Sequence, residues 1–139
     1  NPSLVTDVGG RRWLAGFSLD SSSMDIPQTM RMWHPNFFDA AFGKNPNRWI
    51  SASPIHQLSK NSIPLFVACS TQREDNPCEN SEAFARQAKN LGVNVKVNPL
   101  NLNHGEINDQ LGLEHAYTRE VEKFMASLDK DVAQRLNKD

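Results

Sequence analysis

The chain has 139 residues, of which 38% are hydrophobic and 22% charged, and this composition is ordinary for a single soluble globular domain. A net charge of −1 gives no indication of a nucleic-acid partner or an anionic membrane surface, and the apolar runs are too short to span a bilayer. No targeting segment is visible, and the chain begins with Asn1, so its compartment (cytoplasmic, periplasmic or secreted) stays undetermined.

The first part of the chain predicts one strand between two polar segments. Residues 1–12 contain turn-forming residues and are expected to form polar turns. Residues 13–17 are continuously apolar, which predicts a strand buried on both faces of a parallel sheet. A small polar loop over residues 18–23 follows, and Asp20 and Asp25 are interpreted as residues that cap loops.

Residues 24–62 show no strand periodicity. Their apolar residues recur at mixed helical spacings and are interrupted by Pro27 and Pro35, which predicts short helices and loops. We expect residues 20–62 to form a lid-like segment that would wall a pocket if one exists.

The second half has clearer patterns. A buried strand is predicted at residues 65–68 and a half-exposed, alternating strand at residues 93–98. Between them, an apolar face and a glycine at the end predict a helix over residues 80–91. A second apolar stripe predicts a long helix over residues 114–128, and residues 129–139 are expected to form a fraying helical extension.

The two cysteines, Cys69 and Cys78, flank an acidic loop. They would form a disulfide in an oxidising compartment and would be free thiols in the cytosol. We favour free thiols, because Cys69 ends an apolar strand where a small thiol packs well. Neither cysteine is expected to act as a nucleophile.

Candidate catalytic residues follow the last two predicted strands. Glu74 and Asp75 come after the first of these strands, and His104 comes after the second. Parallel strands joined by a crossover helix bring such loops to one edge of the sheet, so an acid and a histidine of a nucleophile–histidine–acid triad are present. The nucleophile is missing, because G-x-S-x-G occurs nowhere in the chain.

The other histidines have no comparable context. They are interpreted as surface residues or as local hydrogen-bonding residues, and no spacing of histidines, cysteines and acids predicts a metal site or a cofactor. These histidines are His34, His56 and His115.

Taken in order, these segments resemble the C-terminal half of an α/β-hydrolase of the carboxylesterase and lipase-like kind. The resemblance implies an α/β fold with three mostly parallel strands and crossover helices, incomplete without an N-terminal half of the same domain. Residues 1–139 would then be the C-terminal portion of that single domain. The matching segments are residues 17–20, 42–55, 63–67, 80–93, 103–108 and 124–128.

The resemblance also implies roles for individual residues. The family order of nucleophile, acid and histidine places the serine and the oxyanion-hole donors upstream of residue 1, with His104 as the general base. The family's aspartate would fall near position 73, where this chain has Arg73. We favour Asp75 as the acid, because Asp-x-Pro recurs in some relatives and a short side chain suits a tight loop. Glu74 is the alternative.

The function implied by the resemblance is hydrolysis of a carboxylic ester through an acyl-enzyme in the intact protein, with this chain inactive alone. An arylformamidase-like amide hydrolase is an alternative. A non-catalytic binding module and a structural remnant are further alternatives, and the arginine at position 73 favours the binding module. Expected partners are a small ester or amide substrate, the N-terminal half of the domain and a second copy of the chain. An upstream G-x-S-x-G would favour the enzyme, and G-x-[AGN]-x-G would favour the binding module.

Overall fold

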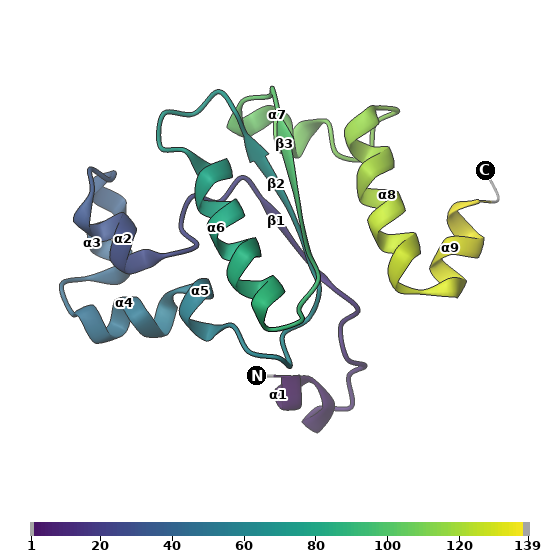
Figure 1. The fold of residues 1–139 in the computed structure, drawn as a ribbon, viewed down its shortest axis with the longest axis horizontal. Coiled ribbons are helices and arrows are strands. Elements are labelled where there is room, and N and C mark those ends of the chain that lie inside the picture. The colour runs from purple at the N-terminus through teal and green to yellow at the C-terminus, as the bar shows by residue number, and fades with distance from the viewer. Residues whose placement is uncertain (1, 138–139) are drawn as a thin grey trace.

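The fold is organised around a parallel sheet with helices on both faces (Figure 1). The computed structural model describes the backbone of residues 2–137. Within this range the sheet has three strands in the order β1-β2-β3, namely β1 (Gly16–Leu19), β2 (Leu65–Ser70) and β3 (Val95–Leu100). Both strand pairs are parallel. The chain therefore has the α/β architecture, with parallel strands and crossover helices, that the sequence predicted.

The helices differ in length and in what they cover. The long helices α6 and α8 lie on opposite sides of the sheet, and a group of four short helices lies beside α6 (Figure 1). None of the helices within residues 2–137 combines the length and apolar character that crossing a membrane requires. The helices are α1 (Pro2–Asp7), α2 (Ile26–Arg31), α3 (Asn36–Phe42), α4 (Pro46–Ala52), α5 (Pro54–Gln57), α6 (Pro77–Asn90), α7 (His104–Asp109), α8 (Ala116–Leu128) and α9 (Lys130–Leu136).

The core forms on both faces of β2, because side chains alternate along a strand. Phe66 and Ala68 pack with Phe124 and its neighbours on α8, and Val67 packs on the other face with Phe84 of α6. All of these side chains are buried. The continuous apolar run of β2 is thus explained by helices on both faces, and the predicted strand at residues 65–68 is confirmed.

The predicted boundaries are less accurate at the other strands. Residues 2–7 form a helix where polar turns were predicted, and β1 begins at Gly16, so that Trp13 precedes the strand and is 66% exposed. β3 begins at Val95 because Val93 belongs to the end of α6. Its N–H bonds the carbonyl of Ala88 across Gly92, which has the left-handed φ of 75° typical of this helix ending.

The segment between β1 and β2 consists of short helices, as the interrupted periodicity predicted. Prolines lie in the first turn of α2, α4 and α5, because a proline lacks the N–H that the first turn leaves unpaired. The carboxylate of Asp25 accepts from the N–H of Gln28 and caps α2, which agrees with its interpretation as a capping residue. The proposed role of residues 20–62 as a lid stays a prediction.

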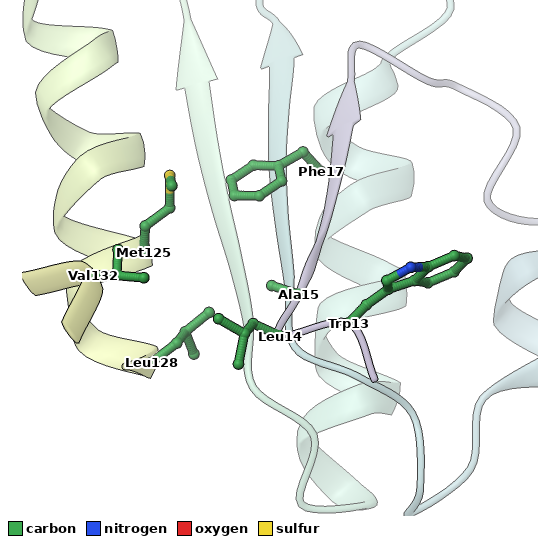
Figure 2. Close-up of a pocket in the computed structure, with 7 residues that line it drawn as sticks. All are labelled: Trp13, Leu14, Ala15, Phe17, Met125, Leu128 and Val132. Carbon is green, nitrogen blue, oxygen red and sulfur yellow. The ribbon is translucent and has the colours of Figure 1, made fainter. Parts of the chain in front are cut away.

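The two edges of the described sheet differ in their protection. β3 contains Pro99, which removes a backbone donor and blocks the addition of another strand. β1 contains no proline and no charged residue, and its Phe17 is 42% exposed. Beside β1 lies an apolar cavity of about 250 Å³ between this strand and the α8–α9 pair (Figure 2). It is lined by Trp13, Leu14, Ala15, Phe17, Met125, Leu128 and Val132.

Candidate functional site

Three loops meet at the carboxyl edge of the sheet, where parallel sheets place their sites. The first starts at Asp20, directly after β1. The second covers residues 71–76 after β2, and the third leads from β3 to His104 at the start of α7. Nδ1 of His104 lies 2.9 Å from Oδ2 of Asp20. An imidazole and a carboxylate that are 84 positions apart in the chain therefore form a hydrogen-bonded pair.

The backbone and the fully buried carboxylate of Asp20 are both held by hydrogen bonds. Its N–H continues the β1–β2 ladder by donating to the carbonyl of Ala68, and its φ of 59° is a left-handed value that Asp tolerates better than most residues. The side chain has no exposed surface. Oδ1 accepts from the N–H of Ser70 at 2.7 Å, and Oδ2 faces Arg73 at 2.8 Å and His104. The burial of this charge is compensated by these charge-assisted bonds.

His104 is placed by the start of a short helix. Asn103 caps α7 by accepting from the N–H of Glu106, whose carboxylate accepts in return from the N–H of Asn103. This reciprocal capping box fixes the first helical turn, and His104 is the first residue of that turn. The imidazole is 64% exposed, and its Nε2 has no hydrogen-bond partner among residues 2–137. The nitrogen that does not face Asp20 is therefore available for proton transfer.

Arg73 joins two carboxylates. Its Nη1 donates to the backbone carbonyl and to Oδ2 of Asp20, both at 2.8 Å. Nε and Nη2 donate to the two oxygens of Asp75 at 2.9 and 2.5 Å, which is the bidentate geometry that suits a guanidinium. Burial alone would lower the pKa of Arg73, but hydrogen bonds and charges from Asp75 and Asp20 outweigh burial and raise the pKa above its ordinary value.

The carboxylate that meets His104 is not one of the two that the sequence favoured. Asp75 pairs with Arg73, and Glu74 forms no hydrogen bond or ion pair within the described part of the chain. Burial would raise the pKa of Asp75, but the hydrogen bonds of Arg73 and Ser22 and the charge of Arg73 keep it below the ordinary value of 3.8. Neither Asp75 nor Glu74 bonds His104 in the described structure, and Asp20 takes their place.

The interpretation of Asp20 as a loop-capping residue was therefore wrong. Its side chain is the buried centre of an ionic cluster, because the end of β1 lies directly beside the end of β2. Two features of the sequence pointed to it. Asp20 follows its strand immediately, and the basic Arg73 stands where an acid was expected, so a nearby carboxylate was needed to pair with it.

Ser70 connects the three loops. Its N–H donates to Asp20, and its Oγ donates to the carbonyl of Leu102 in the loop before α7 at 2.6 Å. The same Oγ accepts from the N–H of Gln72 at the start of the acidic loop. Ser70 is 1% exposed, so the end of the central strand fixes the Asp20 and His104 loops relative to each other.

The cysteines form a disulfide, which corrects the expectation of free thiols. Cys69 and Cys78 are joined, with their Cα atoms 5.1 Å apart. Cys69 lies near the end of β2 and Cys78 in the first turn of α6, so the turn between these elements brings the sulfurs together. The disulfide closes the base of the loop that carries Arg73 and Asp75. Bonds of this kind form and persist in oxidising compartments.

The remaining histidines make local contacts, as expected. Nδ1 of His34 bonds the carbonyl of Met32, and this bond, with help from Asp39, raises the pKa of His34. His115 accepts from the N–H of Tyr117 and caps α8. Over the described residues, no cluster of three or more histidines, cysteines or acids has an arrangement suited to a metal ion.

Comparisons with known proteins support the fold but give no family. No protein-family model matches the sequence, and a search of curated proteins found no match. Among solved structures, the chain is similar to an acetyl ester-xyloside bifunctional hydrolase from Caldicellulosiruptor lactoaceticus, with a TM-score of 0.63 and 22% identity over 84% of this chain. It is also similar to esterase 2 from Thermogutta terrifontis, phosphonylated by sarin, with a TM-score of 0.61 and 17% identity over 84% of this chain.

The extent of these matches is informative. The chain spans 43% of the first neighbour's length and 44% of the second's. At these identities the similarity shows the fold alone. The chain thus has the fold of part of these hydrolases.

Proposed function

We propose that this chain carries the general base and the acid of a serine-hydrolase triad, with His104 as the base and Asp20 as the acid, for hydrolysis of carboxylic esters. The observation that supports the proposal is the 2.9 Å contact between Nδ1 of His104 and the fully buried carboxylate of Asp20 at the carboxyl edge of the sheet. The hydrolase and esterase folds of the structural neighbours favour this chemistry over other uses of a histidine–carboxylate pair. The substrate class is a small ester, with a small amide as the alternative.

In the proposed mechanism each ring nitrogen has one task. Asp20 accepts the hydrogen bond of Nδ1–H, holds this tautomer and stabilises the imidazolium. Nε2 of His104 takes the proton of a serine hydroxyl, whose oxygen attacks the ester carbonyl, and then gives that proton to the departing alcohol. Water attacks the resulting acyl-enzyme with the same base and releases the acid. The serine would come from a part of the protein outside residues 1–139.

The test is steady-state kinetics of the intact protein, in which this chain is joined to the segment that supplies the serine. We expect His104→Gln and Asp20→Asn each to reduce kcat by about 10⁴ or more, because either change destroys the pair. Asp75→Asn and Glu74→Gln are matched controls from the neighbouring loop, and we expect effects below about tenfold. A large loss in Asp75→Asn or Glu74→Gln with a small loss in Asp20→Asn would return the acid to the loop and overturn our assignment.

We further propose that the free edge of β1 takes a parallel strand from the remainder of the same domain. The N–H of Gly16 bonds the carbonyl of Pro64, just before β2, and that of Asp20 bonds a carbonyl of β2, so by alternation those of Phe17 and Leu19 point away from β2. The exposed face of Phe17 and the apolar cavity beside it would be covered by the same segment (Figure 2). The partial coverage of both structural neighbours favours this occupant over an unrelated protein.

This second proposal predicts that the 139-residue chain associates with itself when that segment is absent, because an unprotected edge strand pairs with available strands. Light scattering at increasing concentration measures the association. Phe17→Lys places a charge on the edge and should weaken association, whereas Leu113→Lys, at a residue 58% exposed outside the sheet, should not. A monodisperse monomer at high concentration would contradict the proposal.

A further inference from the structure

We propose that Arg73 is a positioning residue that holds Asp20 in place and opposes protonation of His104, and that Asp75 moderates this effect. The inference deepens the proposed function and rests on it. The arginine at the position where the resemblance places an acid is then part of the site, and it does not indicate the loss of a triad.

The hydrogen bonds of Arg73 show that it is committed to this position. A guanidinium has five N–H donors. One on Nε and one on Nη2 bond Asp75, and two on Nη1 bond the carbonyl and carboxylate oxygens of Asp20. One donor is left for other partners. Because four of the five donors are used within the chain, Arg73 is suited to hold the turn at Asp20 and poorly suited to bind a substrate carboxylate.

The position of Nη1 determines the electrostatic effect on His104. Nη1 lies 3.2 Å from Nδ1 of His104, and both nitrogens face Oδ2 of Asp20. If Nδ1–H donates to Asp20, the contact between Nη1 and Nδ1 brings two N–H donors together and cannot be a hydrogen bond. Arg73 therefore competes for the same carboxylate oxygen, and its positive charge disfavours the imidazolium.

Asp75 makes no hydrogen bond to His104 and binds Arg73. It binds the far side of the guanidinium and neutralises part of its charge. With Asp20 and Asp75 negative and Arg73 positive, the cluster carries a net charge of −1 before His104 is protonated. Removal of Arg73 changes this charge to −2, and removal of the Asp75 charge changes it to zero. The two changes must therefore move the protonation of His104 in opposite directions.

The charged groups near His104 come from three elements. Asp20 faces it from the end of β1, and Arg73, Asp75 and Glu74 belong to the loop after β2. On its own helix, Glu106 is held in the capping box. Glu74 and Glu106 are the same in every variant below, so differences between the variants report on Asp20, Arg73 and Asp75.

The test is a titration of the His104 ring by NMR in the full 139-residue chain, with His104→Gln used to assign the resonance. We expect Arg73→Met to move the midpoint upward by about 1 pH unit and Asp75→Asn to move it downward by about half a unit. These shifts are at the low end of those caused by charges this close, because the ring is exposed to water. Arg73→Lys keeps the charge and should leave the midpoint within about 0.3 units of wild type, by the same reasoning.

The outcomes separate this inference from the proposed function. The Asp20→Asn variant tests the Asp20–His104 pair itself. We expect a lower midpoint for His104, and an unchanged midpoint would refute the pair. If the midpoint of His104 falls in Asp20→Asn but does not rise in Arg73→Met, the role of Arg73 is refuted and the Asp20–His104 pair is retained. The amide spectrum shows whether each variant is folded. If Arg73→Met is unfolded, Asp75→Asn and Arg73→Lys test the role of Arg73. A downward shift of the His104 midpoint in Asp75→Asn with an unchanged midpoint in Arg73→Lys would support the inference. An upward shift in Asp75→Asn would overturn it.

Discussion

Replacing Asp20 by asparagine should destabilise the chain by about 3 kcal/mol even where no activity is measured. Asparagine keeps the shape of the side chain and tolerates the left-handed backbone, so the change removes mainly the charge and one acceptor oxygen. Its amide would then face donors from Ser70, Arg73 or His104, because the aspartate accepts from all three.

The magnitude follows from the burial of the partners. Removing one partner of a buried ion pair costs about 3–5 kcal/mol, and a lost hydrogen bond to a charged group costs about 1.5–3 kcal/mol. The Arg73 side chain is 27% exposed and that of His104 is 64% exposed, so water compensates part of the loss and the lower end applies. For a chain of this size, about 3 kcal/mol corresponds to a fall in Tm of about 10 °C.

The measurement is urea unfolding at pH 7 followed by circular dichroism, with the slope m compared between variants. Asp75→Asn is the matched control. Its carboxylate is 39% exposed, and an exposed ion pair contributes only about 0–1 kcal/mol. If the two variants lose equal stability, or if Asp75→Asn loses more, then Asp20 is not the buried centre of the cluster and our reasoning about the site is wrong.

Three further predictions concern the chain as a whole. The 139-residue chain should not hydrolyse p-nitrophenyl acetate, because it has no G-x-S-x-G nucleophile; turnover at the rate of intact esterases that His104→Ala abolishes would contradict this. No free thiol should react with Ellman's reagent in urea without reductant, and a reactive thiol would disprove the disulfide. Replacing Cys69 and Cys78 by alanine should lower the free energy of unfolding, measured in urea, by about 2–3 kcal/mol. Lys123 and Lys96 hold the pKa of Glu120 at about 2, below its ordinary 4.5, so its stabilising effect is complete above pH 5 and is lost as the pH falls to about 2. Unfolding curves of wild type and Glu120→Gln should therefore converge over that range, and a constant difference would refute this assignment.

Local patterns were sufficient for the elements whose environment is the same along their whole length. The apolar run of β2 indicated burial on both faces, and the stripe from Tyr117 to Leu128 indicated a helix that packs on the sheet, because periodicity reports directly which faces meet the core. The position of His104 at the carboxyl edge also followed from the order of the elements. Element boundaries were less accurate where an end depends on capping, as at Val93.

The partner of His104 depended on tertiary structure. Residue spacing ranked Asp75 and Glu74 above Asp20, because they lie in the loop that the family resemblance indicated. In the fold, β1 pairs beside β2 in register, so Asp20 reaches the end of β2 and its carboxylate is buried between Ser70 and the third loop. The carboxylate of Asp75 instead pairs with Arg73. Periodicity describes which face of an element is buried, but contacts between residues 84 positions apart are determined by strand order and by the pairing of buried charges.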